Sequence, residues 1–129
     1  KWSGWVEDLR AMAALGAWEP KRVEVGPLVI AERVDVALAS VAARRGRMGE
    51  LAKAALKAGV PLPDPARHSG GDPLSAFWVA PEMWFVEAPF ASHEMIASQL
   101  KAALGETASV TEQTDAWVGF DLRAPDRAP

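Results

Sequence analysis

The sequence predicts an α+β fold in which two helices cover one face of an antiparallel sheet. The first observation is the order of elements between residues 34 and 122, which reads strand, helix, strand, strand, helix, strand. This βαββαβ order is typical of a ferredoxin-like sandwich. The second is a central hairpin at residues 74–88 with large apolar side chains on both faces. At 129 residues, we expect an N-terminal extension (1–33), the βαββαβ domain (34–122) and a tail (123–129).

The N-terminal extension combines a helical pattern with a possible hairpin. Residues 22–25 alternate in polarity, Gly26 and Pro27 favour a turn, and residues 28–32 return as a strand. Apolar residues between 2 and 16 recur at helical spacing and predict an amphipathic helix, which packs on its own domain or docks on a partner. They are Trp2, Trp5, Val6, Leu9, Met12 and Ala13.

The first half of the βαββαβ domain consists of a strand and a helix. Residues 34–43 are rich in β-branched residues and alanine and predict a strand. Residues 47–58 have one apolar face at helical spacing, and Gly59 with Pro61 just beyond it marks the helix end. Residues 60–72 contain three prolines and two glycines, so we expect a long irregular loop.

The second half begins with the hairpin. Its arms flank the turn Ala80-Pro81-Glu82-Met83, where proline presets the φ angle that a turn requires. Ser92 is expected to cap a helix that continues to Leu104 and ends at Gly105. Residues 109–122 are expected to form one long strand, with Gly119 marking a bulge or a close backbone approach.

The hairpin carries more apolar side chains than one covered sheet face requires. A strand with one face in water alternates apolar and polar residues, whereas here bulky residues are consecutive. Leaving such side chains exposed to water would forgo roughly 1.5–3 kcal/mol of burial free energy for each of them. We therefore expect a second layer on the sheet, formed by the N-terminal segment, another copy of the chain or a different protein. The predicted partner-interface residues are Trp2, Trp5, Phe77, Trp78, Trp84 and Phe85.

Composition and charge argue against several function classes. The net charge of −3 argues against nucleic-acid binding, and Arg44, Arg45 and Arg47 are the densest basic group. The chain has no cysteine, which excludes thiolate zinc sites and cysteine nucleophiles. No apolar run approaches the ~20 residues of a membrane-spanning helix. We expect a cytoplasmic protein that binds neither nucleic acid nor membrane.

The sequence contains no recognisable catalytic or metal-binding motif. His68 and His93 are the only histidines, and the second histidine of a zinc-protease helix is replaced by Ala97. The glycine-rich residues 69–72 precede a strand and lack the lysine of a phosphate-binding loop, and no Gly-x-Ser-x-Gly occurs. We therefore expect no catalytic and no metal-binding residues, and a binding or structural module.

Three blocks of sequence resemble one known family. Residues 34–46 (VDVALASVAARRG), 80–89 (APEMWFVEAP) and 110–117 (VTEQTDAW) resemble segments of the gamma subunit of heterotetrameric sarcosine oxidase. The likeness extends in order over residues 28–122. It departs from the family pattern at Ala80, where glycine is usual, and at Glu82, where aspartate is usual.

The resemblance implies a fold related to folate-binding aminomethyltransferase domains and a non-catalytic accessory role. The complex would demethylate sarcosine oxidatively to glycine, with methylene-tetrahydrofolate and hydrogen peroxide as products. The alpha, beta and delta subunits would be the partners, and the isolated chain would self-associate. FAD, FMN, NAD and tetrahydrofolate would belong to the larger subunits, and none would be bound by this chain.

Two alternatives remain open at this point. The related fold binds folate, so the chain could be a free-standing tetrahydrofolate-binding module with Trp84, Trp117 and Glu112 as candidate ligand contacts. It could also be the equivalent subunit of an N-methylglutamate dehydrogenase. No sequence feature distinguishes that complex from sarcosine oxidase.

Overall fold

The computed structural model describes residues 12–125, which divide into two units. Unit 1 comprises the described parts of Lys1–Val34 and Val118–Pro129, and unit 2 comprises Asp35–Trp117. The helix expected over residues 2–16, with Trp2 and Trp5, lies largely outside the described residues. The expected domain end at residue 122 is corrected, because the chain from Val118 onward belongs to unit 1.

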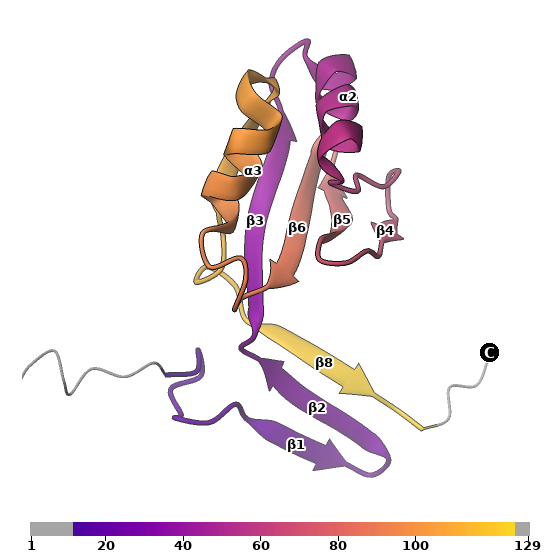
Figure 1. Cartoon of the computed structure of the whole chain (residues 1–129). Coiled ribbons are helices and arrows are strands. Elements are labelled where there is room, and N and C mark those ends of the chain that lie inside the picture. The colour runs from indigo at the N-terminus through magenta and orange to yellow at the C-terminus, as the bar shows by residue number, and fades with distance from the viewer. Residues whose placement is uncertain (1–11, 126–129) are drawn as a thin grey trace, which may run out of the picture. The chain divides into compact units, whose positions relative to one another are not determined.

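Unit 1 is a three-stranded antiparallel sheet (Figure 1). Strands β1 (Arg22–Val25) and β2 (Leu28–Arg33) form the expected hairpin, with Gly26 at a positive φ of 57° in the turn. Strand β8 (Gly119–Arg123) pairs with the other edge of β2. The sheet order is therefore β1-β2-β8.

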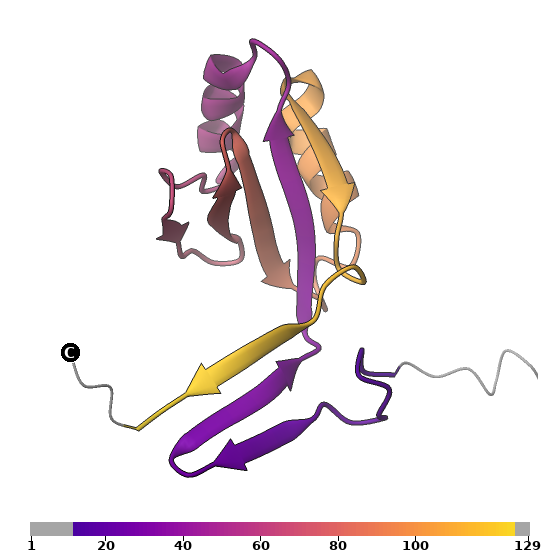
Figure 2. The same ribbon diagram turned by 180° about the vertical axis from the view of Figure 1, so that it is seen from behind.

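Unit 2 is a five-stranded sheet with two helices on one face (Figures 1 and 2). The sheet order is β4-β5-β6-β3-β7, and every neighbouring pair is antiparallel. This arrangement confirms the α+β class. In chain order the elements are β3 (Val36–Ala43), α2 (Met48–Ala58), β4 (His68–Ser69), β5 (Ser75–Ala80), β6 (Met83–Pro89), α3 (Ile96–Leu104), the 3-10 turn η1 (Gly105–Thr107) and β7 (Ala108–Glu112).

The core of unit 2 lies between the helices and the sheet. Alternate residues of β3 point toward the helices, so Ala37, Ala39 and Val41 are fully buried. The helices cover them with leucine and isoleucine side chains spaced three or four residues apart. These side chains are Leu51 from α2 and Ile96, Leu100 and Leu104 from α3.

Two expected elements have different bounds. Helix α3 begins at Ile96 rather than after Ser92, because the Ser92 hydroxyl bonds the Pro89 carbonyl at 3.4 Å instead of capping the helix. The long strand expected over residues 109–122 is two strands, β7 and β8, which belong to different sheets. A turn closed by the hydrogen bond from Ala116 N–H to the Gln113 carbonyl interrupts it.

Candidate functional site

The candidate site is the face of the unit 2 sheet opposite helices α2 and α3, which we call the outer face (Figure 2). Strand register assigns its residues: Ala39 and Val41 lie in the core, so Ser40 between them points to the opposite side. Residues directly paired across antiparallel strands share a face. Phe85 pairs with Ser40, and Phe77 pairs with Phe85, so both phenylalanines lie on the outer face.

An aromatic cluster, Phe77, Phe85 and Trp117, occupies the middle of the outer face. The rings of Phe77 and Phe85 meet edge to face with centroids 5.5 Å apart. Trp117, from the turn after β7, meets Phe85 in the same manner at 5.6 Å. Phe85 is 8% exposed, whereas Trp117 is 59% exposed. The cluster therefore has a buried centre and an exposed indole.

A short hydrogen-bonded chain holds Trp117 in place. Its indole N–H donates to the Gln113 side-chain oxygen at 3.3 Å, and the Gln113 amide donates to the Ser40 hydroxyl at 3.2 Å. The Gln113 backbone N–H also donates to the Leu38 carbonyl at 2.8 Å. The buried Ser40 hydroxyl thus has a partner, and the turn carrying Trp117 is fixed to β3.

The other two aromatic residues of the hairpin lie on the helix-covered face. Trp84 is 6% exposed, belongs to the core, and donates its indole N–H to the Pro63 carbonyl at 2.7 Å. This burial corrects its assignment to a partner interface. Trp78 pairs with Trp84 and packs against the same core. Of the six predicted interface residues, the structure places Phe77 and Phe85 on the outer face, and Trp2 and Trp5 lie outside the described residues.

The three folate candidates are not brought together. Trp84 and Trp117 lie on opposite faces of the sheet, because Trp117 contacts Phe85 and Trp84 is in the core. Glu112 is engaged elsewhere: its carboxylate accepts hydrogen bonds from the Ala97 backbone N–H and from the Thr114 hydroxyl. These residues therefore do not form one binding site, which corrects that expectation.

Two of the three clustered arginines are paired with carboxylates. Arg44 donates to Glu106 at 2.7 Å, and Arg47 donates to Glu50 at 2.6 Å. The hydrogen bond to Glu50, together with its negative charge, raises the pKa of Arg47 above its ordinary value. The positive charge at this corner of unit 2 is therefore partly compensated.

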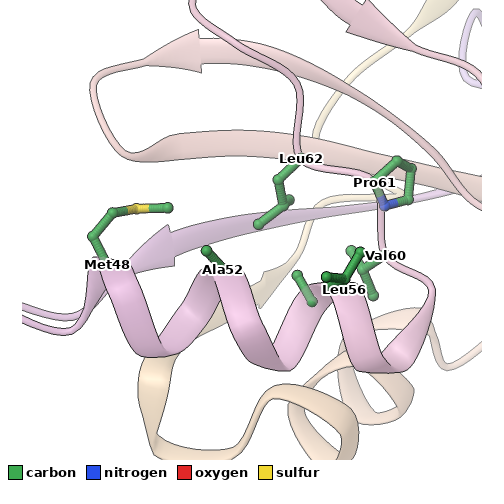
Figure 3. A pocket seen from close by; sticks show the side chains of 7 residues that line it. Met48, Ala52, Leu56, Val60, Pro61 and Leu62 are labelled. Carbon is green, nitrogen blue, oxygen red and sulfur yellow. The ribbon is translucent and has the colours of Figure 1, made fainter.

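Two adjoining apolar cavities flank helix α2 and share Met48. The first, about 220 Å³, lies between α2 and the chain that follows the helix (Figure 3). The second, about 330 Å³, has Glu82 as its single charged lining residue. Their linings offer no set of groups for acid–base or nucleophilic chemistry. The first is lined by Met48, Ala52, Ala55, Leu56, Val60, Pro61 and Leu62, and the second by Met48, Pro65, Trp78, Pro81, Glu82 and Trp84.

Sequence reasoning did not identify the contact between Trp117 and Phe85, nor the link from Gln113 to Ser40. The signal for both was the polar run Gln113-Thr114-Asp115, which follows β7 and lies in the turn before Trp117. Within residues 12–125, no group of three or more His, Asp or Glu side chains is arranged to hold a metal ion. No helix in that part of the chain has the length and apolarity needed to cross a membrane.

No protein-family model matches the chain, and no curated protein sequence matches it significantly. A functional inference therefore starts from the topology of unit 2 and from its outer face.

Proposed function

We propose that this chain is a non-catalytic accessory subunit of a heterotetrameric sarcosine oxidase, whose outer face packs against a larger subunit. The observation that carries the proposal is the aromatic cluster on the sheet face opposite helices α2 and α3. Trp117 is 59% exposed there, and tryptophan is enriched among residues that dominate binding energy. Polar residues of the edge strand β7, Ser109 and Thr111, lie beside this apolar centre. An apolar centre with a polar rim is typical of protein interfaces.

The three blocks of family resemblance meet on this face. Ser40 comes from the first block, Phe85 from the second, and Gln113 and Trp117 from the third. Ser40 pairs with Phe85 across β3 and β6, and the third block contacts both of them. Segments far apart in the sequence therefore converge on one surface, which is consistent with a shared binding role.

The topology supports a ferredoxin-like fold related to aminomethyltransferase domains. In the order β5-β6-β3-β7, strand β6 lies between β5 and β3, and β3 lies between β6 and β7. Each helix therefore connects two strands that are separated by one antiparallel strand, which is the split βαβ unit. In the proposed complex, FAD, FMN, NAD and tetrahydrofolate are bound by the larger subunits.

The proposal is tested by co-expressing the tagged chain with the alpha, beta and delta subunits. We expect the wild-type chain to capture them, and Trp117→Ala and Thr111→Glu to reduce capture at least about tenfold, since truncating a hot spot costs 2 kcal/mol or more. Thr111 pairs with Ser40, so the new charge lies on the outer face. Leu56→Glu is the matched control. It adds the same charge on helix α2, which covers the other face of the sheet, and the Leu56 side chain is already 84% exposed.

Two outcomes contradict the proposal. Equal capture by the Thr111→Glu and Leu56→Glu chains would show that the outer face is not the interface. A monodisperse monomer that captures none of the larger subunits would exclude the accessory role itself. Calorimetry with tetrahydrofolate addresses the folate-binding alternative, and saturable heat from the isolated chain would favour that alternative.

A further inference from the structure

Strand β1 is one edge of the unit 1 sheet, and within residues 12–125 no strand pairs with its outer side (Figure 1). All four of its residues are exposed. The edge of a sheet presents a row of N–H and C=O groups, which form a template for pairing with another chain. The outer side of β1 is therefore a surface that a further strand can extend.

The backbone groups of Arg22 and Glu24 point to this outer side. In an antiparallel pair, residues whose N–H and C=O groups bond the neighbouring strand alternate with residues whose groups point away from it. The Glu32 N–H donates to the Lys21 carbonyl at 2.8 Å, so the carbonyl of Lys21 points toward β2. Val23, two positions further along, has the same orientation. The residues on either side of Val23 therefore direct their N–H and C=O groups outward.

The charges on this edge are symmetric about Val23. The side chains of Arg22 and Glu24 lie 3.6 Å apart, and both are more than 60% exposed. A two-fold axis through Val23 would place Arg22 of each copy opposite Glu24 of the other. Each such pair would exchange two main-chain hydrogen bonds and bring opposite charges together. Charges on an edge usually discourage pairing, whereas these are complementary to a second copy of the same edge.

The neighbouring two-fold registers oppose like charges. An axis through Arg22 would place the two Arg22 side chains opposite each other, and would set Pro20, which has no N–H, against Glu24. An axis through Glu24 would oppose two carboxylates. The central residue of the other edge strand, β8, is Asp121, so pairing of β8 about its middle would also oppose two carboxylates. The self-complementary register is the one centred on Val23.

We propose that strand β1 pairs antiparallel with β1 of a second copy of the chain, about a two-fold axis at Val23. The pairing joins two three-stranded sheets into one continuous sheet of six strands. Strands of four residues provide a small contact area, so the dimer is weak and depends on concentration. The two-fold contact is closed, and no third copy adds at β1. The inference concerns unit 1 and is independent of the proposed role of the outer face of unit 2.

The test uses single cysteines, because the sequence contains none. Val23→Cys and Val25→Cys chains are oxidised by glutathione disulfide at equal concentration, and the rate of covalent dimer formation is measured. Residues that face each other in the closely spaced pair have Cα atoms about 4.5 Å apart, which suits a disulfide. The two copies of residue 25 would be four positions out of register, roughly 13 Å apart along the strand.

We expect the Val23→Cys chain to cross-link at least about tenfold faster than the Val25→Cys chain, because pairing raises the local concentration of the first thiol alone. The two positions are matched in exposure, at 51% for Val23 and 59% for Val25. Random collision therefore contributes similarly to both rates.

Charge reversal tests the register. In the Val23→Cys background, Arg22→Glu and Glu24→Arg should each lower the rate to that of the Val25→Cys chain, because each variant opposes like charges twice. A mixture of the two charge variants should restore the fast rate, since the acidic positions of one chain then face the basic positions of the other. An ion pair that acted only within one chain would not be restored by mixing.

Equal cross-linking rates for the Val23→Cys and Val25→Cys chains would overturn the proposal. A rate that Arg22→Glu leaves unchanged, or a mixture no faster than its components, would overturn it as well. Preferential cross-linking between the Val23→Cys and Val25→Cys chains would indicate the register centred on Glu24 and contradict the proposed one. These rates are measured on the isolated chain, so their failure is distinguishable from failure to capture the larger subunits.

Discussion

The indole of Trp117 meets the ring of Phe85 edge to face, with centroids 5.6 Å apart and ring planes 70° apart. This contact joins the turn after the edge strand β7 to β6, the middle strand of the sheet. It buries Phe85 on the face opposite helices α2 and α3. The outer face is thus partly built from the chain's own turn, and in the proposed complex the exposed indole would contact the larger subunit.

Trp117→Ala should destabilise unit 2 by about 1–2 kcal/mol. The variant loses the edge-to-face contact and exposes part of Phe85, and such aromatic pairs contribute about 0.5–1.5 kcal/mol beyond burial of area. Urea unfolding monitored by circular dichroism measures the change. Leu56→Ala is the control, expected to change stability by less than about 0.5 kcal/mol because Leu56 is highly exposed.

A double-mutant cycle with Phe85→Leu separates the contact from general loss of packing. We expect a coupling free energy of about 0.5–1.5 kcal/mol between positions 85 and 117. Additive effects, with no coupling, would contradict the proposed contact.

Trp84→Phe should cost about 1–3 kcal/mol of stability. The indole N–H of Trp84 donates to the Pro63 carbonyl at 2.7 Å, and phenylalanine would leave that partly buried carbonyl without its donor. Trp117→Phe is the matched control: it removes an exposed hydrogen bond of 3.3 Å and keeps a ring against Phe85. Equal losses in the two variants would show that the bond to Pro63 is not the cause.

The elements set by local patterns were predictable from sequence, and those set by pairing between distant segments were not. Helix α2 matched its prediction to within one residue, because its apolar spacing and Gly59 are local signals. In the hairpin, both faces of each strand are apolar, so alternation did not reveal which side Trp84 or Phe85 takes. The face that each side chain takes follows from pairing with β3. Trp84 pairs with Val41, which lies in the core, so Trp84 faces the helices.

The end of the last strand shows the same limit. Residues 109–122 contain two segments with strand propensity, and nothing local indicates that the second one leaves the sheet. Strand β8 pairs with β2, about ninety residues away in the sequence, as in the pair Ala31 and Asp121. The same limit applied to predicting the candidate site. Trp117 contacts Phe85 because the chain turns at residues 113–116, whereas the strand expected over residues 109–122 contains no turn.

Glu32→Gln should loosen the start of unit 1. The carboxylate accepts hydrogen bonds from the N–H groups of both Leu15 and Lys21, and the neutral amide has one acceptor oxygen for the two donors. We expect a loss of about 1–3 kcal/mol, together with faster amide exchange at Leu15 and Lys21. Glu24→Gln, at an exposed position of strand β1, is the control and should change neither quantity. Unchanged amide exchange in the Glu32→Gln chain would contradict an anchoring role.

Alanine substitutions at Gly49, inside α2, and at Gly59, which ends it, should change the free energy of unfolding with opposite signs. Gly59 ends the helix at φ 74°, a left-handed conformation that costs an alanine roughly 1–2 kcal/mol, although an added Cβ would meet no atom within 4 Å. Gly49 lies inside the helix and its Cβ position is equally open, so alanine there should stabilise by about 0.5–1 kcal/mol. Thermal unfolding of both variants measures the difference, with Tm falling for Gly59→Ala and rising for Gly49→Ala. Because neither site has a steric conflict, shifts of the same sign would show that backbone conformation does not govern these positions.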